Sequence, residues 1–475
     1  MPNKIVHSYC DDVLGEHDGV ELAKMIKNRD LSTAEVVEAA IRRAEKVEPA
    51  LNAIELALYE KALKITPENQ KGKLAGVPTF IKDNNDLSGT PTRQGSRASL
   101  GRVARQDGPF VSQFLATGVI PIGKSRLPEF GLNASTEFGN EPPTKNPWNT
   151  AYSAGGSSGG SAALVAAGVV PLAHGNDGGG SIRIPAACCG LFGLKPRRGR
   201  TLSARATRNM PIKIVCEGVL SRTVRDTAHC LYEMESYHQN SKLGPIGLIE
   251  NPSSKPLKIG ILFSSINQYE ADRETRFAMD ETLKKLERMG HRIEPFKLPF
   301  DESFATSFAL YWGMLAFFLT LYGKATAFTG LDSEKMNLLS KGMAKHFLTN
   351  IHKAPQAIHQ LKKSYFEYQS FFKSFDLVMS PVTAHPAPKL GHLDPERPFE
   401  QLFESLKSYA SFTPLNNATG GPAMSVPIGF TEFGVPIGGH FSANHGDEKT
   451  LLELAYQLEE HKPWPRIGYQ NHDKP

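Results

Sequence analysis

The chain contains 475 residues, of which 40% are hydrophobic, and its formal net charge of +5 is the small excess of 54 basic over 49 acidic side chains. Such a chain can bury a large core, and its mild charge argues against the strongly basic class of nucleic-acid-binding proteins. The five cysteines have no framework spacing, which argues against a disulfide-rich secreted fold and predicts free thiols in a reducing compartment.

No linker-like or low-complexity stretch divides the chain, although its length alone suits about three domains. We therefore expect one α/β domain over residues 1–475. It would have a helical N-terminal segment to about residue 70, a core over about 71–235, and further strands and covering helices over about 236–475. The first 19 residues carry five charged side chains before any apolar run, so we expect no signal peptide and a cytoplasmic location.

The N-terminal segment is predicted to be helical, because Ser32 and Glu35 form a capping box before apolar residues at helical spacing. Residues 76–81 then predict a short buried strand that delivers Lys82 into a polar loop. Burial disfavours the charged form of lysine, and a neutral amine is an effective general base. A lysine taken alone is nevertheless most often a surface residue.

Residues 118–125 match the Walker A nucleotide-binding pattern letter for letter. Their interior is apolar and β-branched, where a phosphate cradle needs flexible glycine, and Pro128 weakens the required helix start. We therefore interpret this segment as a buried strand leading into a loop.

Two glycine–serine clusters, GGSSGGS at residues 155–161 and DGGGS at residues 177–181, flank an apolar stretch. Glycine lets backbone N–H groups approach a substrate oxygen, and a serine hydroxyl can attack a carbonyl carbon once it loses its proton. Flexible linkers have a similar composition, but residues 161–170 predict a buried helix between the clusters. We interpret the second cluster as a nucleophile, Ser181, inside its own oxyanion hole.

The first cluster also matches the G-x-S-x-G nucleophile elbow, which requires a strand directly before it. Residues 146–150 are turn-forming instead, so the elbow is disfavoured. His174 is the only histidine near either cluster, and its place at the end of an apolar run favours a structural role over that of a base. Lys82 is the better candidate for the base.

The motifs also have a characteristic spacing: Ser157 follows Lys82 by 75 positions, and Ser181 follows Ser157 by 24. With Lys82-Asp83-Asn84, the two clusters, and further matches at 123–130, 190–196, 221–226, 380–383 and 422–429, the chain resembles the amidase signature family of serine hydrolases. The resemblance implies an α/β fold with a mixed sheet of about eleven strands between helices. It also implies an amidase that forms an acyl-serine intermediate without metal or organic cofactor.

The resemblance further implies a Ser-Ser-Lys triad, with Ser181 as nucleophile, Ser157 as proton relay after a cis peptide bond, and neutral Lys82 as base. The oxyanion hole would use the backbone N–H groups of Gly178, Gly179, Gly180 and Ser181. Glycine at position 178 departs from the Thr or Ile usual in the family and adds flexibility to the loop.

Three residues are expected to support the triad. Asp177 and Arg183 flank the loop at residues 178–181 and would pair across it. Ile182, Ile184 and Pro185 predict that the segment after Ser181 is buried and strand-like. Ser158 would hydrogen-bond to the triad or cap the helix that follows.

Alternatives remain within and outside the family. The A subunit of the glutamyl-tRNA amidotransferase releases ammonia from glutamine, but its acid that holds the glutamine amino group aligns with Tyr409, which supplies no fixed negative charge. The run over residues 174–185 most resembles 6-aminohexanoate cyclic dimer hydrolases. A non-catalytic binding protein on the same fold is disfavoured by the intact triad.

Farther along the chain, residues 257–262 predict a strand and residues 275–289 the helix after it. Residues 303–323 carry no charge and are long enough to span a bilayer, but they lie in mid-chain between motifs. We expect them to form a buried or pocket-covering helix, without membrane contact.

The remaining clusters predict structure and solvent contact. The basic run at residues 195–200 lacks aromatic interleaving and predicts a solvated loop without a nucleic-acid partner. His385 and His392 have poor metal-ligand spacing, and adjacent Cys188 and Cys189 indicate core packing. The expected partner is a small-molecule amide, and a homodimer is left open.

Overall fold

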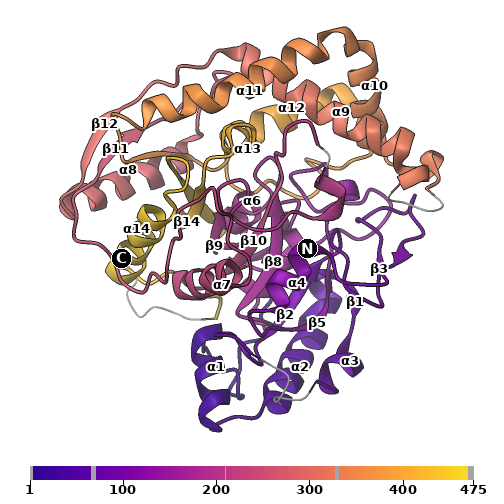
Figure 1. Ribbon diagram of the computed structural model, residues 1–475, viewed down its shortest axis with the longest axis vertical. Coiled ribbons are helices and arrows are strands. Elements are labelled where there is room, and N and C mark those ends of the chain that lie inside the picture. Colours follow the sequence, from indigo (N-terminus) through magenta and orange to yellow (C-terminus); the bar gives the residue numbers. More distant parts are fainter. Residues whose placement is uncertain (1–3, 66–70, 209, 327–330, 469–475) are drawn as a thin grey trace.

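A mixed sheet of eight strands forms the centre of the computed structural model, which describes residues 4–65, 71–208, 210–326 and 331–468 (Figure 1). Its strands are β8 (Leu172–Asp177), β9 (Phe192–Lys195), β10 (Cys216–Ser221), β11 (Lys258–Ile261), β12 (Arg292–Pro295), β13 (Leu377–Pro381), β14 (Ala423–Phe430) and β15 (Pro436–Ala443). Their order across the sheet is β12-β11-β13-β15-β14-β9-β10-β8. β11 runs parallel to β12 and β13, and the other pairs are antiparallel.

Helices cover both faces of this sheet, as the strand register shows. On β15, Gly438 faces helix α6 (Arg183–Cys189), because a Cβ added there would lie 2.5 Å from the Ala187 Cβ. On β14, Gly429 pairs with Ile437, the neighbour of Gly438, and therefore lies on the opposite face. A Cβ at Gly429 would lie 3.1 Å from Ala278 of helix α8 (Arg273–Arg288). The expected α/β sheet between helices is confirmed.

Three further strands, β1 (Ile54–Ala57), β2 (Pro78–Lys82) and β5 (Ile120–Ser125), form a second sheet in the order β1-β5-β2. The expected large sheet is therefore divided into sheets of eight and three strands. Strand β2 lies beside β8, but side chains join the two strands: the Thr79 hydroxyl donates to the Leu172 carbonyl, and the Lys82 N–H donates to His174 Nδ1. The polar end of β2 is thereby fixed against the central sheet.

The remaining elements are short strand pairs and helices. The pairs are β3 (Pro91–Thr92) with β4 (Arg102–Val103), and β6 (Lys145–Asn146) with β7 (Asn149–Ser153). The other helices are α1 (Gly19–Asn28), α2 (Thr33–Leu51), α3 (Tyr59–Leu63), α4 (Pro109–Leu115), α5 (Gly159–Ala166), α7 (Val224–Tyr237), α9 (Glu302–Thr326), α10 (Leu338–Thr349), α11 (Ala354–Phe371), α12 (Phe399–Tyr409), α13 (Pro414–Thr419) and α14 (Glu448–His461). In Figure 1, α1, α2 and α3 lie at one end of the molecule, and α9, α10 and α11 at the other.

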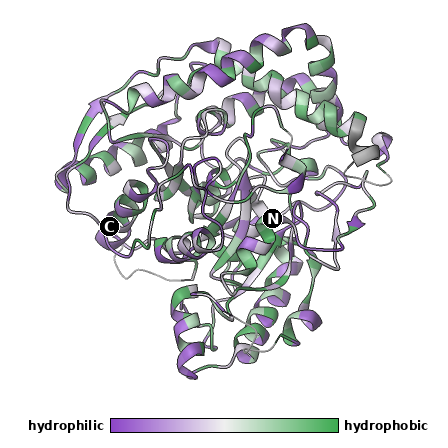
Figure 2. Cartoon of the chain, viewed as in Figure 1, coloured by the Kyte–Doolittle hydropathy of each residue, from purple (hydrophilic) through white to green (hydrophobic). Residues whose placement is uncertain are grey.

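Several local predictions are confirmed. The capping box of Ser32 and Glu35 begins α2, whose buried side follows the predicted apolar spacing. The nucleotide-like motif forms the buried strand β5, the stretch between the clusters forms the buried helix α5, and the predicted strand and helix near residue 260 are β11 and α8. Outer helices such as α2 show both hydrophilic and hydrophobic residues in Figure 2, as expected for elements with one buried side.

The strand-like segment predicted at residues 182–185 is wrong, because helix α6 begins at Arg183. Pro185 falls in the first turn, where a helix makes no use of the missing N–H group, so β-branched residues and proline did not prevent a helix. A short strand, β7, also precedes the first glycine–serine cluster where turn residues indicated none. It belongs to a separate two-stranded pair and ends four residues before Ser157.

The basic run at residues 195–200 is not a solvated loop. Lys195 is fully buried in β9, and the Arg200 guanidinium is buried between the carboxylates of Glu235 and Glu448. Arg198 donates to the carbonyl oxygen of Asn417. These charges hold the chain together and leave little of the run for an external partner.

The uncharged stretch forms most of α9. Among the described residues, Glu302–Leu321 is the one segment long and apolar enough to cross a membrane by length and composition, and 44% of its most apolar window is buried. Phe304, Phe308 and Tyr311 are among its buried side chains. The predicted helix is present and partly buried, and the absence of membrane contact stays a prediction.

Candidate active site

The Lys82 side chain ends in a fully buried polar pocket. Strand β2 carries it to the junction with β8, where its Nζ lies 2.7 Å from Ser157 Oγ, 2.9 Å from Ser158 Oγ and 2.6 Å from Asn176 Oδ1. The two hydroxyls come from the first glycine–serine cluster and the amide from β8. Sequence positions 82, 157 and 158 are therefore brought together as expected.

Burial lowers the pKa of Lys82 to about 7 from its ordinary value of 10.5. The carboxylates of Glu217 and Asp177 act against this shift, but they do not outweigh the loss of hydration. A substantial fraction of this lysine is therefore a neutral amine at neutral pH, which is the form that accepts a proton.

The His174 ring contacts the backbone of Lys82 and fixes the end of strand β2. Its Nδ1 accepts the backbone N–H of Lys82 at 3.1 Å, so its proton resides on Nε2, which lies 3.0 Å from Glu217 Oε2. Burial lowers the pKa of this imidazole. The neutral ring thus holds the end of β2, and the predicted structural role is supported by these contacts.

Ser157 is buried at the start of the first cluster. The Gly156–Ser157 peptide bond is cis, as the resemblance implied. A Cβ added at Gly131 would lie 3.2 Å from Ser157 Oγ, so the backbone near residue 131 closely approaches this hydroxyl. Of the two roles open for Ser158, the structure shows the contact with Lys82 and no side-chain hydrogen bond that caps α5.

The segment at residues 178–181, called the Ser181 loop below, connects β8 to α6. Ser181, Gly178 and Gly179 are half-buried. Among the residues that the structure describes, no protein acceptor takes the N–H groups of these three residues. Gly180 differs from the expectation, because its N–H donates to Asp177 Oδ1 at 2.8 Å. Its φ of 128° lies in the region that favours glycine.

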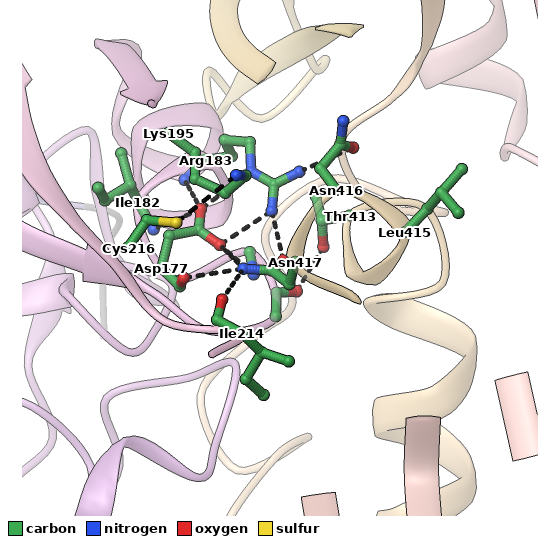
Figure 3. Close-up of polar contacts among 12 residues, drawn as sticks. Asp177, Ile182, Arg183, Lys195, Ile214, Cys216, Thr413, Leu415, Asn416 and Asn417 are labelled. Atoms are coloured by element: carbon green, nitrogen blue, oxygen red, sulfur yellow. Dashed lines mark hydrogen bonds and ion pairs between the residues drawn. The ribbon is translucent and has the colours of Figure 1, made fainter. Parts of the chain in front are cut away.

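Asp177 and Arg183 form the expected pair across this loop (Figure 3). Both side chains are fully buried, and two parallel hydrogen bonds of 2.9 Å join the guanidinium to the carboxylate. The guanidinium is the largest of the influences that lower the pKa of Asp177, and it overcomes the opposing effect of burial. The carboxylate thus stays ionised and also accepts the N–H groups of Gly180 and Ile182.

Helix α13 holds this pair from the other side. Asn417 donates through Nδ2 to the backbone and side-chain oxygens of Asp177 at 2.8 and 2.9 Å, and its Oδ1 accepts from Arg183 at 2.7 Å. The Thr413 hydroxyl, at the residue before the helix, donates to the Gly179 carbonyl at 2.6 Å. In Figure 3 the Asn417 side chain points toward Asp177 and Arg183 from α13.

The guanidinium also reaches His440 on β15, whose Nε2 lies 2.9 Å from Arg183 Nη1. Burial together with the cationic neighbour lowers the pKa of His440 well below its ordinary value. The neutral ring accepts from Arg183 at Nε2, so its Nδ1–H donates to Ser380 Oγ at 2.9 Å. The Ser181 loop is therefore connected by hydrogen bonds to the centre of the large sheet.

Tyr409 is fully buried at the end of α12, and its hydroxyl lies 3.3 Å from Cys188 Sγ. Burial raises the pKa of this phenol well above its usual range. The His385 ring lies 4.7 Å from the Tyr409 ring, centroid to centroid. This position therefore supplies no negative charge for a substrate amino group, in agreement with the argument from sequence.

A cavity adjoins the Ser181 loop at Gly179. Helices α9 and α12 and the residues before α13 supply most of its wall, with Phe308, Trp312 and Phe403 among its aromatic residues. In the part of the chain that the structure describes, no group of three or more His, Cys, Asp or Glu side chains could hold a metal ion.

Sequence reasoning missed the residues that fix the site from a distance. Asn176 lies near the end of the buried strand β8, and its amide beside Asp177 was a signal that could have indicated a partner for Lys82. Thr413 and Asn417 act on the Ser181 loop from 234 and 240 positions away and lie in an unremarkable polar stretch. Glu217 is the one carboxylate of the buried strand β10, and His440 is the one histidine of the buried strand β15. A buried titratable group indicates a partner but does not identify it.

Comparison with known proteins identifies the family. The Amidase family model matches residues 35–452, which include every site residue described above. The chain belongs to the amidase signature family. It is accordingly an amide-hydrolysing enzyme, and its fold is that of other amidase signature enzymes.

Two curated relatives match the amidase over nearly its whole length. "Putative amidase AmiC" of Mycobacterium leprae (strain TN) is 43% identical over 463 residues, which cover 97% of the chain and 98% of the relative. The 6-aminohexanoate-cyclic-dimer hydrolase of Paenarthrobacter ureafaciens is 32% identical and covers 94% and 95%, respectively. A solved structure of a 6-aminohexanoate cyclic dimer hydrolase in complex with its substrate superposes with a TM-score of 0.86 at 30% identity, covering 95% of the chain and 98% of that structure.

Proposed function

We propose that this amidase hydrolyses a carboxamide through an acyl-enzyme, with Ser181 as nucleophile, Ser157 as proton relay and neutral Lys82 as base. The observation that carries the proposal is the set of contacts around Lys82 Nζ. A neutral amine has two N–H donors and one lone pair, and three partners surround this nitrogen.

The three partners divide in the way that a base requires. Asn176 Oδ1 can only accept, and the Ser158 hydroxyl lies 3.3 Å from the Asn176 carbonyl, to which it donates while it accepts from Lys82. Both N–H groups of the amine are then used. The lone pair remains for the Ser157 hydroxyl at 2.7 Å, so a proton can pass from Ser157 to Lys82.

Catalysis would then proceed in two steps. In the first, Ser181 Oγ loses its proton to Ser157, which passes its own proton to Lys82, and a C–O bond forms at the amide carbonyl. As the C–N bond breaks, the proton returns through Ser157 to the departing amine. In the second step, water attacks the acyl-serine ester by the same proton path, and the carboxylic acid is released.

The negative charge that develops on the carbonyl oxygen needs fixed donors. The half-buried N–H groups of Gly178, Gly179 and Ser181 are available for this, whereas that of Gly180 is held by Asp177. Thr413 and Asp177 hold the peptide unit between Gly179 and Gly180 at both ends. Such fixed donors stabilise the transition state without a cost for reorganisation at the moment of reaction.

Labelling with a fluorophosphonate probe tests the assignment of the nucleophile. We expect one covalent adduct on Ser181, its loss in Ser181→Ala, and loss of amide hydrolysis in the same variant. Ser153→Ala is a matched control, because Ser153 is a buried serine of β7 outside the triad, and it should keep the adduct. An adduct elsewhere, or hydrolysis that survives Ser181→Ala, would contradict the proposal.

A further inference from the structure

The cavity at Gly179 lies on the side of the Ser181 loop that faces helix α9. A Cβ added at Gly179 would lie 3.9 Å from the Phe308 ring, so α9 closely approaches the backbone that binds the carbonyl oxygen. Gly179 belongs to the cavity wall, and Ser157 does not. Gly131, whose backbone closely approaches the Ser157 hydroxyl, also lies outside the wall.

This arrangement separates the two halves of a bound amide. The departing amine must receive its proton from Ser157, so it has to lie on the Ser157 side of the scissile carbonyl. The acyl half lies on the other side of that carbonyl. The cavity at Gly179, which excludes Ser157 from its wall, is therefore the place for the acyl half.

The wall of this cavity is apolar and aromatic. Phe304, Phe308 and Trp312 come from successive turns of α9, and Phe403 and Leu406 face them from α12. The one cationic group in the described wall, Lys407, is half-exposed and pairs with Glu404. A charged acyl group would lose hydration here without a free partner, whereas an apolar group gains by burial.

A second cavity adjoins the first, because the two share three wall residues, Ile266, Ser411 and Leu415. These residues form a partition between the two spaces. In Figure 3 the Leu415 side chain points away from the polar cluster around Asp177. The Ser411 hydroxyl oxygen is buried and has no hydrogen-bond partner among the described residues, which leaves a donor unused at the partition.

We propose that the cavity at Gly179 binds a neutral, mainly apolar acyl group and that the partition of Ile266, Ser411 and Leu415 limits the length of this group. Where the acyl group carries an acceptor near its far end, Ser411 donates a hydrogen bond to it. The proposal rests on the proposed function, because it requires Ser181 as the nucleophile that attacks the carbonyl and Ser157 as the proton donor to the departing amine. It names the substrate class as carboxamides of apolar acids of limited length.

A panel of p-nitroanilides with one leaving group and different acyl groups tests the class. We expect kcat/KM for neutral alkanoyl and phenylalkanoyl groups to exceed that for glutamyl and succinyl groups by about 100-fold or more. Equal or better hydrolysis of the charged acyl groups would overturn the proposal. So would the absence of turnover on every neutral acyl group while the fluorophosphonate still labels Ser181.

Leu415→Ala tests the partition by gain of function. Opening the partition joins the two cavities, so the alkanoyl chain length with the highest kcat/KM should increase by two or more carbons. Leu262→Ala is the matched control, because Leu262 lines the second cavity alone and its truncation leaves the partition in place. An unchanged optimum in Leu415→Ala, with labelling of Ser181 intact, would overturn the length limit.

Ser411→Ala tests the hydrogen bond with paired substrates. The two substrates carry acyl groups of equal length, one with an ether oxygen near its far end and one of hydrocarbon alone. For the parent enzyme, kcat/KM should be higher for the ether substrate, and Ser411→Ala should abolish this difference. A difference that persists in Ser411→Ala would assign the hydrogen-bond donor to another group and overturn the role of Ser411. Loss of Ser181 labelling throughout would contradict the proposed function instead, so the two failures are distinguishable.

Discussion

The Thr413 hydroxyl donates a hydrogen bond of 2.6 Å to the carbonyl oxygen of Gly179, across 234 positions of sequence. Asp177 accepts the N–H at the other end of the same peptide unit, that of Gly180, at 2.8 Å. The orientation of this peptide determines where the neighbouring N–H groups of Gly179 and Ser181 point. Thr413 is therefore a positioning residue for the proposed carbonyl-binding site.

Thr413→Val keeps the shape of the side chain and removes the hydroxyl. We expect kcat to fall about tenfold, equivalent to about 1.4 kcal/mol, with KM changed less than about twofold, because the lost hydrogen bond aligns donors used in the transition state. Thr413→Ser retains the hydroxyl and should keep most of the rate. Steady-state kinetics on one amide measures all three enzymes, and a rise in KM at constant kcat would contradict the role.

The rate should depend on pH through Lys82. Because only the neutral amine accepts a proton, kcat/KM should rise with pH around a midpoint near 7, where burial places the pKa of Lys82. The Glu217 carboxylate favours the ammonium form, so Glu217→Gln should lower this pKa and move the midpoint to lower pH. Initial rates from pH 5 to 9 give the midpoints. A shift to higher pH would refute the assignment of the base.

Arg183→Met should destabilise the fold as well as the site. It leaves the Asp177 carboxylate buried without its cation, which costs about 3–5 kcal/mol of unfolding free energy. Arg42→Met is the matched control, since the exposed pair of Arg42 with Glu38 contributes less than about 1 kcal/mol. Urea unfolding at pH 7 measures both variants, and equal effects would show that burial of the pair has no energetic consequence.

Asp226 connects α7 to the start of α1, and its carboxylate accepts the N–H groups of Gly19 and Val20. Burial and the Asp18 carboxylate raise the pKa of Asp226 to about 7 from 3.8. Between these values the folded chain binds the additional proton, so this group makes stability fall as pH rises from about 4 to about 7. Asp226→Asn removes the titration.

We therefore expect the unfolding free energy of Asp226→Asn, relative to that of the parent, to increase as pH rises from about 4 to about 7. Urea unfolding at several pH values gives this difference. Glu35→Gln is a control of opposite sign, because hydrogen bonds from Ser32 lower the pKa of this exposed carboxylate. Its unfolding free energy relative to the parent should decrease as pH rises through the ordinary glutamate range and then stay constant up to pH 7. A constant difference for Asp226→Asn would contradict the raised pKa.

The residues of the proposed triad could be predicted because each is part of a dense local motif. Lys82 is the last residue of a buried strand that the sequence indicated, and the two serines occur in glycine-rich clusters. The spacing between motifs was also readable. Local sequence was sufficient to predict which of these residues lie close together at Lys82, and their catalytic roles stay predictions.

The surroundings were less predictable, because their meaning depends on packing. The segment after Ser181 contains β-branched residues and proline, yet tertiary contacts and the Asp177 pair favour helix α6. The basic run became buried because Glu235 and Glu448 lie beside it only in the folded chain. Thr413 likewise gave no local signal, since its partner is a backbone carbonyl far away in sequence.

The contact between the His174 ring and the Lys82 backbone joins strands of two different sheets, so it forms only once both sheets have assembled. The side chain of Lys82 leaves water only when the three-stranded sheet packs against the eight-stranded one, so the proposed base forms only at that stage. Before that event its pKa would stay near 10.5, and the amine would be protonated at neutral pH. Under the proposed mechanism, a partly folded chain would have both serines but no neutral amine to accept their protons, and hydrolysis would begin only with native assembly.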